Sequence, residues 1–108
     1  MDFSKDGKMI VSCSKTGSIK TWNAESGKLI KTFSGHTDSV LEAHFFPDGS
    51  KILSCSKDSS VKVWNTKTTK VLFSETIDND AGFTSAVAIS DDGEHIALGG
   101  NDLIVKYA

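Results

Sequence analysis

Apolar and polar residues alternate along short segments of this chain, and turn residues separate the segments. In its central part, residues 40–46, 51–56, 60–65 and 70–74 are rich in β-branched and apolar side chains and are bounded by Gly, Pro, Asp and Ser. None of these segments shows the period of about 3.6 residues that an amphipathic helix requires. Four strands of about five or six residues joined by short turns predict a small antiparallel meander.

The same alternation occurs on both sides of this central meander. The further strands that we predict, three on each side, lie at residues 8–14, 18–23, 28–33, 84–89, 94–99 and 103–107. The chain is therefore predicted to be all-β.

A turn motif recurs along the chain at nearly constant spacing. It reads FSKDG at residues 3–7, FPDG at 46–49 and ISDDG at 89–93. The glycines Gly7, Gly49 and Gly93 are 42 and 44 residues apart, and Trp22 and Trp64 are also 42 apart. This spacing indicates one supersecondary unit copied about two and a half times.

We divide the chain into three repeats. Repeat one, about residues 1–33, lacks most of its first strand; repeat two is about 34–75; repeat three, about 76–108, lacks its last strand. A unit of this length cannot bury its apolar face alone and must stack against neighbours. We therefore expect a segment of a longer array, with its function on the surface that stacking creates.

Composition and charge exclude several functions. The chain is 38% apolar and 24% charged, as in soluble globular domains, and its net charge is −2. Its basic side chains are all lysine, and arginine is the residue best suited to phosphate and base contacts, so we expect no nucleic-acid partner. No apolar run of about eighteen residues occurs, and the first residues are polar, so neither a membrane span nor a signal peptide is expected.

The two cysteines occupy equivalent positions in successive repeats. Cys13 and Cys55 each lie within a Ser-Cys-Ser segment of a predicted strand, which favours two buried thiols over a disulfide. Reduced thiols without an export signal predict an intracellular protein, cytoplasmic or nuclear.

Repeat two carries an ordered set of motifs. These are GH at residues 35–36, FPDG at 46–49, SCSKD at 54–58 and VKVWN at 61–65. In this order and spacing the unit resembles a WD repeat of the β-propeller family. The resemblance implies four-stranded antiparallel blades of a partial, open propeller.

The resemblance also implies a structural polar network within repeat two. Family members join Trp, Ser, His and Asp by hydrogen bonds, which correspond here to Trp64, Ser54, His36 and Asp58. In repeat one Thr16 stands in place of the aspartate, so only repeat two has the full set.

The same side chains also invite a catalytic interpretation. A serine, a histidine and a carboxylate are the parts of a hydrolase triad, but Ser54 lies in a predicted regular strand, without a nucleophile elbow or a helix N-terminus beside it. The remaining histidines have no Cys or His at metal-ligand spacing, and no phosphate-binding glycine motif occurs. We therefore expect no catalytic residue, no metal and no cofactor.

Stacked blades place two kinds of loop at one end, namely those between second and third strands and those between repeats. These loops are the candidate partner-binding surface, and they contain Lys15, Thr16, Thr37, Asp38, Lys57, Asp80 and Phe83. Phe83 is a candidate aromatic anchor, and the alternative is that it packs under its own loop.

The function that the resemblance implies is a non-catalytic protein-protein interaction scaffold. The expected partners are other proteins, together with further blades or copies of this chain that complete the ring. The alternative is a self-assembling propeller that binds a small ligand such as a sugar. Against this alternative, no aromatic and polar pocket recurs in all three repeats.

Overall fold

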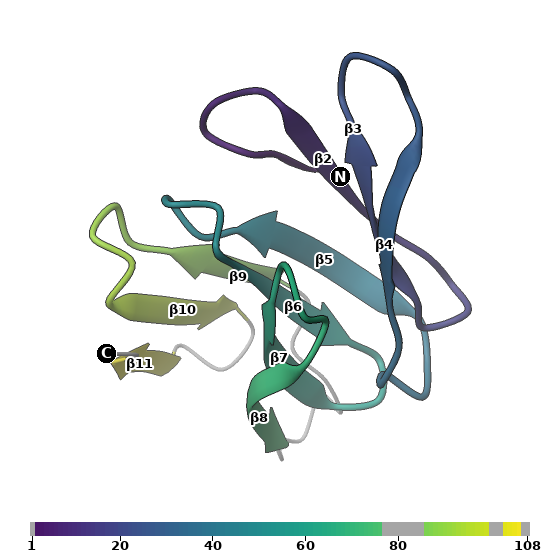
Figure 1. Cartoon of the computed structure of the whole chain (residues 1–108). Helices are drawn as coiled ribbons and strands as arrows, with labels where there is room; N and C mark the ends of the chain where they lie inside the picture. The colour runs from purple at the N-terminus through teal and green to yellow at the C-terminus, as the bar shows by residue number, and fades with distance from the viewer. Residues whose placement is uncertain (1, 77–85, 100–102, 107–108) are drawn as a thin grey trace.

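The computed structural model describes residues 2–76, 86–99 and 103–106, and all regular structure in these residues is β-strand (Figure 1). The first sheet contains β1 (Asp2–Phe3), β2 (Met9–Cys13), β3 (Ile19–Asn23) and β4 (Leu29–Phe33). The second contains β5 (Val40–Phe45), β6 (Lys51–Ser56), β7 (Ser60–Asn65) and β8 (Val71–Thr76). The third contains β9 (Ala86–Ile89), β10 (His95–Gly99) and β11 (Leu103–Lys106).

Each sheet is an antiparallel meander in which consecutive strands are neighbours. The sheets fan out from their first strands, and the part of the chain described does not close a ring (Figure 1). The predicted fold class, all-β with four-stranded antiparallel blades of an open propeller, is confirmed. We call the sheets blade one, blade two and blade three.

The last strand of blade two is longer than the sequence predicted. We expected it at residues 70–74, whereas β8 extends to Thr76. Its final residues, Glu75 and Thr76, are exposed, but their backbones pair with the beginning of β7. Backbone pairing is independent of side-chain polarity, so the length of β7 sets the end of the strand.

The turn glycines of the three repeats have the same backbone conformation. Gly7, Gly49 and Gly93 have φ angles of 73°, 74° and 73°. This left-handed region is costly for residues with a Cβ atom, which explains why the motif ends in glycine each time.

Two apolar cores hold the blades together, and each lies between neighbouring sheets. The core between blades one and two contains Val11, Ile19, Phe33, Val40, Ala43, Phe45, Ile52 and Trp64. The core between blades two and three contains Phe46, Leu53, Cys55, Val61, Val63, Val87 and Ile96. Blade two is therefore covered on both faces, and the adjacent residues Ile52 and Leu53 of β6 enter different cores. Stacking, rather than any single blade, buries the apolar residues.

The first strands of the blades also contact one another through side-chain carboxylates. β1 contacts β5, and β5 contacts β9. Asp2 Oδ2 accepts a hydrogen bond from the Phe45 N–H at 3.2 Å, and Glu42 Oε2 accepts one from the Val87 N–H at 2.8 Å. Each of these carboxylates therefore links its own blade to the backbone of the next.

Candidate functional site

The loops of blades one and two meet at one end of the sheets, which we call the loop face: residues 14–18, 34–39 and 57–59. The Val40 N–H donates to the Ser14 carbonyl at 2.9 Å, and the Lys57 N–H donates to the Ser39 carbonyl at 2.9 Å. The first bond joins blade one to blade two, and the second fixes the loop between β6 and β7. The loop face is therefore held in place by backbone contacts.

Two glycines allow these loops to approach closely. Gly17 has φ of 91°, and a Cβ atom there would lie 2.6 Å from the His36 carbonyl oxygen. At Gly35 a Cβ atom would lie 2.9 Å from Cη2 of Trp64. Side chains at these positions would push the His36 loop away from both blades.

His36 begins a chain of hydrogen bonds that crosses blade two. Trp64 Nε1–H donates to Ser54 Oγ at 2.8 Å, and His36 Nε2 lies 2.7 Å from the same oxygen. On its other side, His36 Nδ1 lies 3.0 Å from Asp58 Oδ2. Because Ser54 accepts from the indole, its hydroxyl proton is free to be donated to Nε2, which assigns the His36 proton to Nδ1. The structure thus brings together the four residues that the resemblance placed in one network.

Burial makes each link of this chain costly to break. Trp64 is 1% exposed, Ser54 is 0% exposed and the His36 side chain is 0% exposed. A buried polar group without a partner is strongly unfavourable, so a complete chain fixes one arrangement of strands and loop.

Ser60 is a further member of the network, and our sequence analysis missed it. Its Oγ donates to Asp58 Oδ1 and lies 3.0 Å from His36 Nδ1. The Thr37 N–H also donates to Asp58, at 2.9 Å. A signal for Ser60 was present in the sequence, because Ser18 occupies the equivalent position of repeat one.

The surroundings shift the acid-base properties of both titratable members. Burial, opposed in part by the hydrogen bond and charge of Asp58, lowers the pKa of His36 below its ordinary value of 6.5. Burial alone would raise the pKa of Asp58, but hydrogen bonds from Ser60, the Thr37 N–H and His36 hold it well below its usual value. His36 is therefore neutral and Asp58 ionised at neutral pH.

This arrangement does not present a nucleophile. The Ser54 hydroxyl is bonded on both sides and has no contact with solvent, so it cannot approach a substrate. The serine, histidine and carboxylate therefore act as a structural chain.

Blade one has only half of the network. Trp22 Nε1–H donates to Ser12 Oγ at 2.9 Å, but Thr16 replaces the aspartate and instead bonds Ser14 at 2.8 Å. Ser14 also bonds Ser18 at 2.9 Å. The hydroxyl groups of this loop therefore satisfy one another.

The predicted partner-binding residues that the structure describes all lie exposed on the loop face. They are Lys15, Thr16, Thr37, Asp38 and Lys57. Asp80 and Phe83 lie outside the described residues. The structure therefore gathers side chains from two blades on one exposed surface.

The described residues contain no group of three or more His, Cys, Asp or Glu side chains placed to hold a metal ion. His44 lies between two carboxylates, 3.6 Å from Asp2 and 3.8 Å from Glu42. Within the same ranges of the chain, no helix is long and apolar enough to cross a membrane.

Stacked four-stranded blades with a Trp-Ser-His-Asp chain define the WD-repeat class of β-propellers. The family model for the WD domain, G-beta repeat, matches residues 1–23 and 27–65, which is more than half of the 108 residues. The chain belongs to the WD-repeat family, whose members generally serve as protein-interaction scaffolds.

Two curated relatives share part of this sequence. WD repeat domain-containing protein 83 of Danio rerio is 42% identical over 41 residues, which cover 38% of this chain and 13% of the relative. The Xenopus laevis protein of the same name is 42% identical over 40 residues, which cover 37% of this chain and 13% of that protein. The matched segment therefore spans a small part of these relatives.

Proposed function

We propose that this chain is part of a non-catalytic protein-interaction scaffold, and that the loop face is its contact surface. The observation that carries the proposal is that exposed side chains from two blades stand on a buried frame. The frame is the hydrogen-bonded chain from Trp64 to Asp58, and the exposed side chains include Lys15, Asp38 and Lys57. Recognition residues are typically carried by loops that a rigid scaffold positions.

The test reverses charges on the loop face and identifies the proteins that bind. We would purify complexes from cell extract with the wild-type chain, with Lys15→Glu/Lys57→Glu, and with Lys28→Glu/Lys70→Glu as the matched control. Lys28 and Lys70 are also exposed but lie at the opposite end of the blades. We expect a partner that the loop variant loses and the control retains, and that binds the purified wild-type chain directly. The same proteins recovered with both variants would refute the proposal.

We also propose that further blades or other copies of the chain cover its exposed apolar residues. Leu29 is 49% exposed and Ile30 43% on β4, and Val71 is 42% and Leu72 47% exposed on β8. Exposed aliphatic pairs at equivalent positions of two blades are typical of surfaces that bind another element. Light scattering tests this proposal: a discrete β-rich oligomer supports self-assembly, and a stable monomer that does not associate contradicts completion by copies.

The location that we propose is intracellular, cytoplasmic or nuclear. Cys13 and Cys55 are both free thiols, and Cys55 is fully buried. Such thiols persist in a reducing compartment. Fluorescence microscopy of the tagged protein tests this location, and a secreted product would contradict it.

A further inference from the structure

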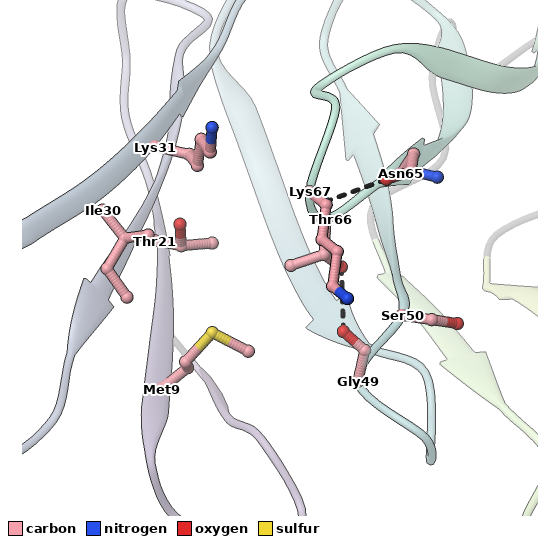
Figure 2. Close-up of a pocket in the computed structure, with 9 residues that line it drawn as sticks. All are labelled: Met9, Thr21, Ile30, Lys31, Gly49, Ser50, Asn65, Thr66 and Lys67. Carbon is pink, nitrogen blue, oxygen red and sulfur yellow. Dashed lines mark hydrogen bonds between the residues drawn. The ribbon is translucent and has the colours of Figure 1, made fainter.

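A cavity opens between blades one and two at the end opposite the loop face, which we call the turn face (Figure 2). Its volume is about 480 Å³. Met9 and Ile30 line the wall formed by blade one, and the turns of blade two at Gly49 and Thr66 line the other. Lys31 belongs to the first wall and Lys67 to the second. Neither blade forms this cavity alone.

A second cavity of about 540 Å³ continues from the first. The two share Met9, Gly49, Ser50 and Lys67, so together they form one groove along the turn face. An elongated groove with an open surface suits an extended chain segment better than a compact ligand.

Charge is distributed unevenly along this groove. Lys31 and Lys67 are exposed, no acidic residue lines the first cavity, and neither lysine forms an ion pair among the described residues. The second cavity contains the carboxylates Asp6 and Asp48, which accept hydrogen bonds from their own turns. One end of the groove therefore attracts negative charge, while the other end holds two carboxylates.

This distribution favours an acidic peptide over a nucleic acid. A nucleic-acid strand carries a phosphate at every step, so it would place negative charge against Asp6 and Asp48. The first cavity also offers the aliphatic side chains of Met9 and Ile30 and no aromatic ring on which a base could stack. A peptide can place its acidic residues at one end and an aliphatic side chain beside them.

We propose that this groove binds a short extended segment of a partner protein in which an aliphatic side chain lies next to acidic residues. The aliphatic side chain packs against Met9 and Ile30, and the carboxylates pair with Lys31 and Lys67. Residues without negative charge occupy the end that contains Asp6 and Asp48. This site is separate from the loop face and adds a second contact surface to the scaffold.

The test measures fluorescence anisotropy of a fluorescein-labelled synthetic peptide in which glutamates adjoin one leucine and serines and glycines complete the other end. We expect Lys31→Met and Lys67→Met each to weaken binding by about two- to fivefold, as for exposed ion pairs. Ile30→Ser is expected to weaken it by about fivefold, because apolar contact area is lost. Circular dichroism of each variant verifies that the blades remain folded, since all three side chains are exposed.

Lys70→Met is the matched control, because Lys70 is an exposed lysine of the same turn that does not line the groove. It is expected to bind the peptide as the wild type does. Equal weakening by Lys70→Met would reduce the effect to general charge attraction and overturn the proposal. So would equal binding of a peptide with lysines in place of the glutamates, or no binding at low salt.

Two further measurements separate this site from other polyanions and from the loop face. If polyuridylate or phosphatidylserine vesicles bind with the same dependence on Lys31 and Lys67, the peptide assignment is wrong. The loop-face variant Lys15→Glu/Lys57→Glu is expected to bind the peptide normally. Failure of the loop-face proposal would therefore leave this one intact, and the reverse also holds.

Discussion

Ser54 is the point at which substitution breaks two links of the polar chain at once. Ser54→Ala removes the acceptor of Trp64 Nε1–H, at 2.8 Å, and the donor to His36 Nε2, at 2.7 Å. Trp64 is 1% exposed and the His36 side chain 0%, so water cannot replace the lost partner. Each stranded group costs about 1–3 kcal/mol, and we therefore expect the free energy of unfolding to fall by about 2–5 kcal/mol.

The equivalent serine of blade one provides a matched control. Ser12→Ala removes a single bond of 2.9 Å to Trp22, whose side chain is half-buried and accessible to water. The expected loss is about 0.5–1.5 kcal/mol, the net value of an ordinary hydrogen bond. The two variants have the same chemical change and differ in the burial of the partners.

Urea denaturation followed by tryptophan fluorescence measures both losses, with the slope of the transition checked for each variant. If Ser54→Ala and Ser12→Ala destabilise the chain equally within about 0.5 kcal/mol, burial of the network does not set its value. The reasoning would then be refuted, even if both variants are less stable than the wild type.

Further predictions concern Asp58, pH and buried groups. Asp58→Ala is expected to lower the free energy of unfolding by about 1–3 kcal/mol, because His36 loses its acceptor; unchanged urea unfolding would contradict this. The pKa of His36 is lower in the folded state than its ordinary 6.5, so the unfolded chain takes up a proton first. Stability should therefore fall as pH decreases below about 6.5, and a urea midpoint constant from about pH 8 to about pH 5 would disprove the assignment. Thr21 is 0% exposed and its hydroxyl has no hydrogen-bond partner within the described residues, so Thr21→Val should raise stability by about 1 kcal/mol in the same assay; a loss would indicate a partner for the hydroxyl. Burial raises the pKa of Cys55 to about 12, so a thiol reagent at neutral pH should modify only the half-buried Cys13 until urea unfolds the chain; two reactive thiols in the folded chain would contradict this.

Local sequence determines much of the fold. β6 and β7 lie where we predicted them, at residues 51–56 and 60–65, because their alternation and the turns beside them are local signals. β8 differs, since its last residues are polar and join the sheet only through pairing with β7. Its end depends on the neighbouring strand, which the sequence of the segment does not contain.

The candidate site shows the same division. Trp64, Ser54, His36 and Asp58 were identified through the resemblance, because each has a set offset within the repeat. Ser60 was missed, since its role depends on the hairpin returning its hydroxyl to Asp58. The groove of the turn face was not predictable in this way, because its walls come from two repeats and its shape depends on how their blades stack.

The carboxylate links between first strands have a consequence for how the blades separate. The amide protons of Phe45 and Val87 are held by Asp2 and Glu42, which belong in each case to the preceding blade. These protons lose their acceptors when the neighbouring blades part, even if every strand remains paired within its own sheet. Hydrogen exchange at these amides therefore reports the opening of each blade junction individually, with Phe45 recording the first junction and Val87 the second.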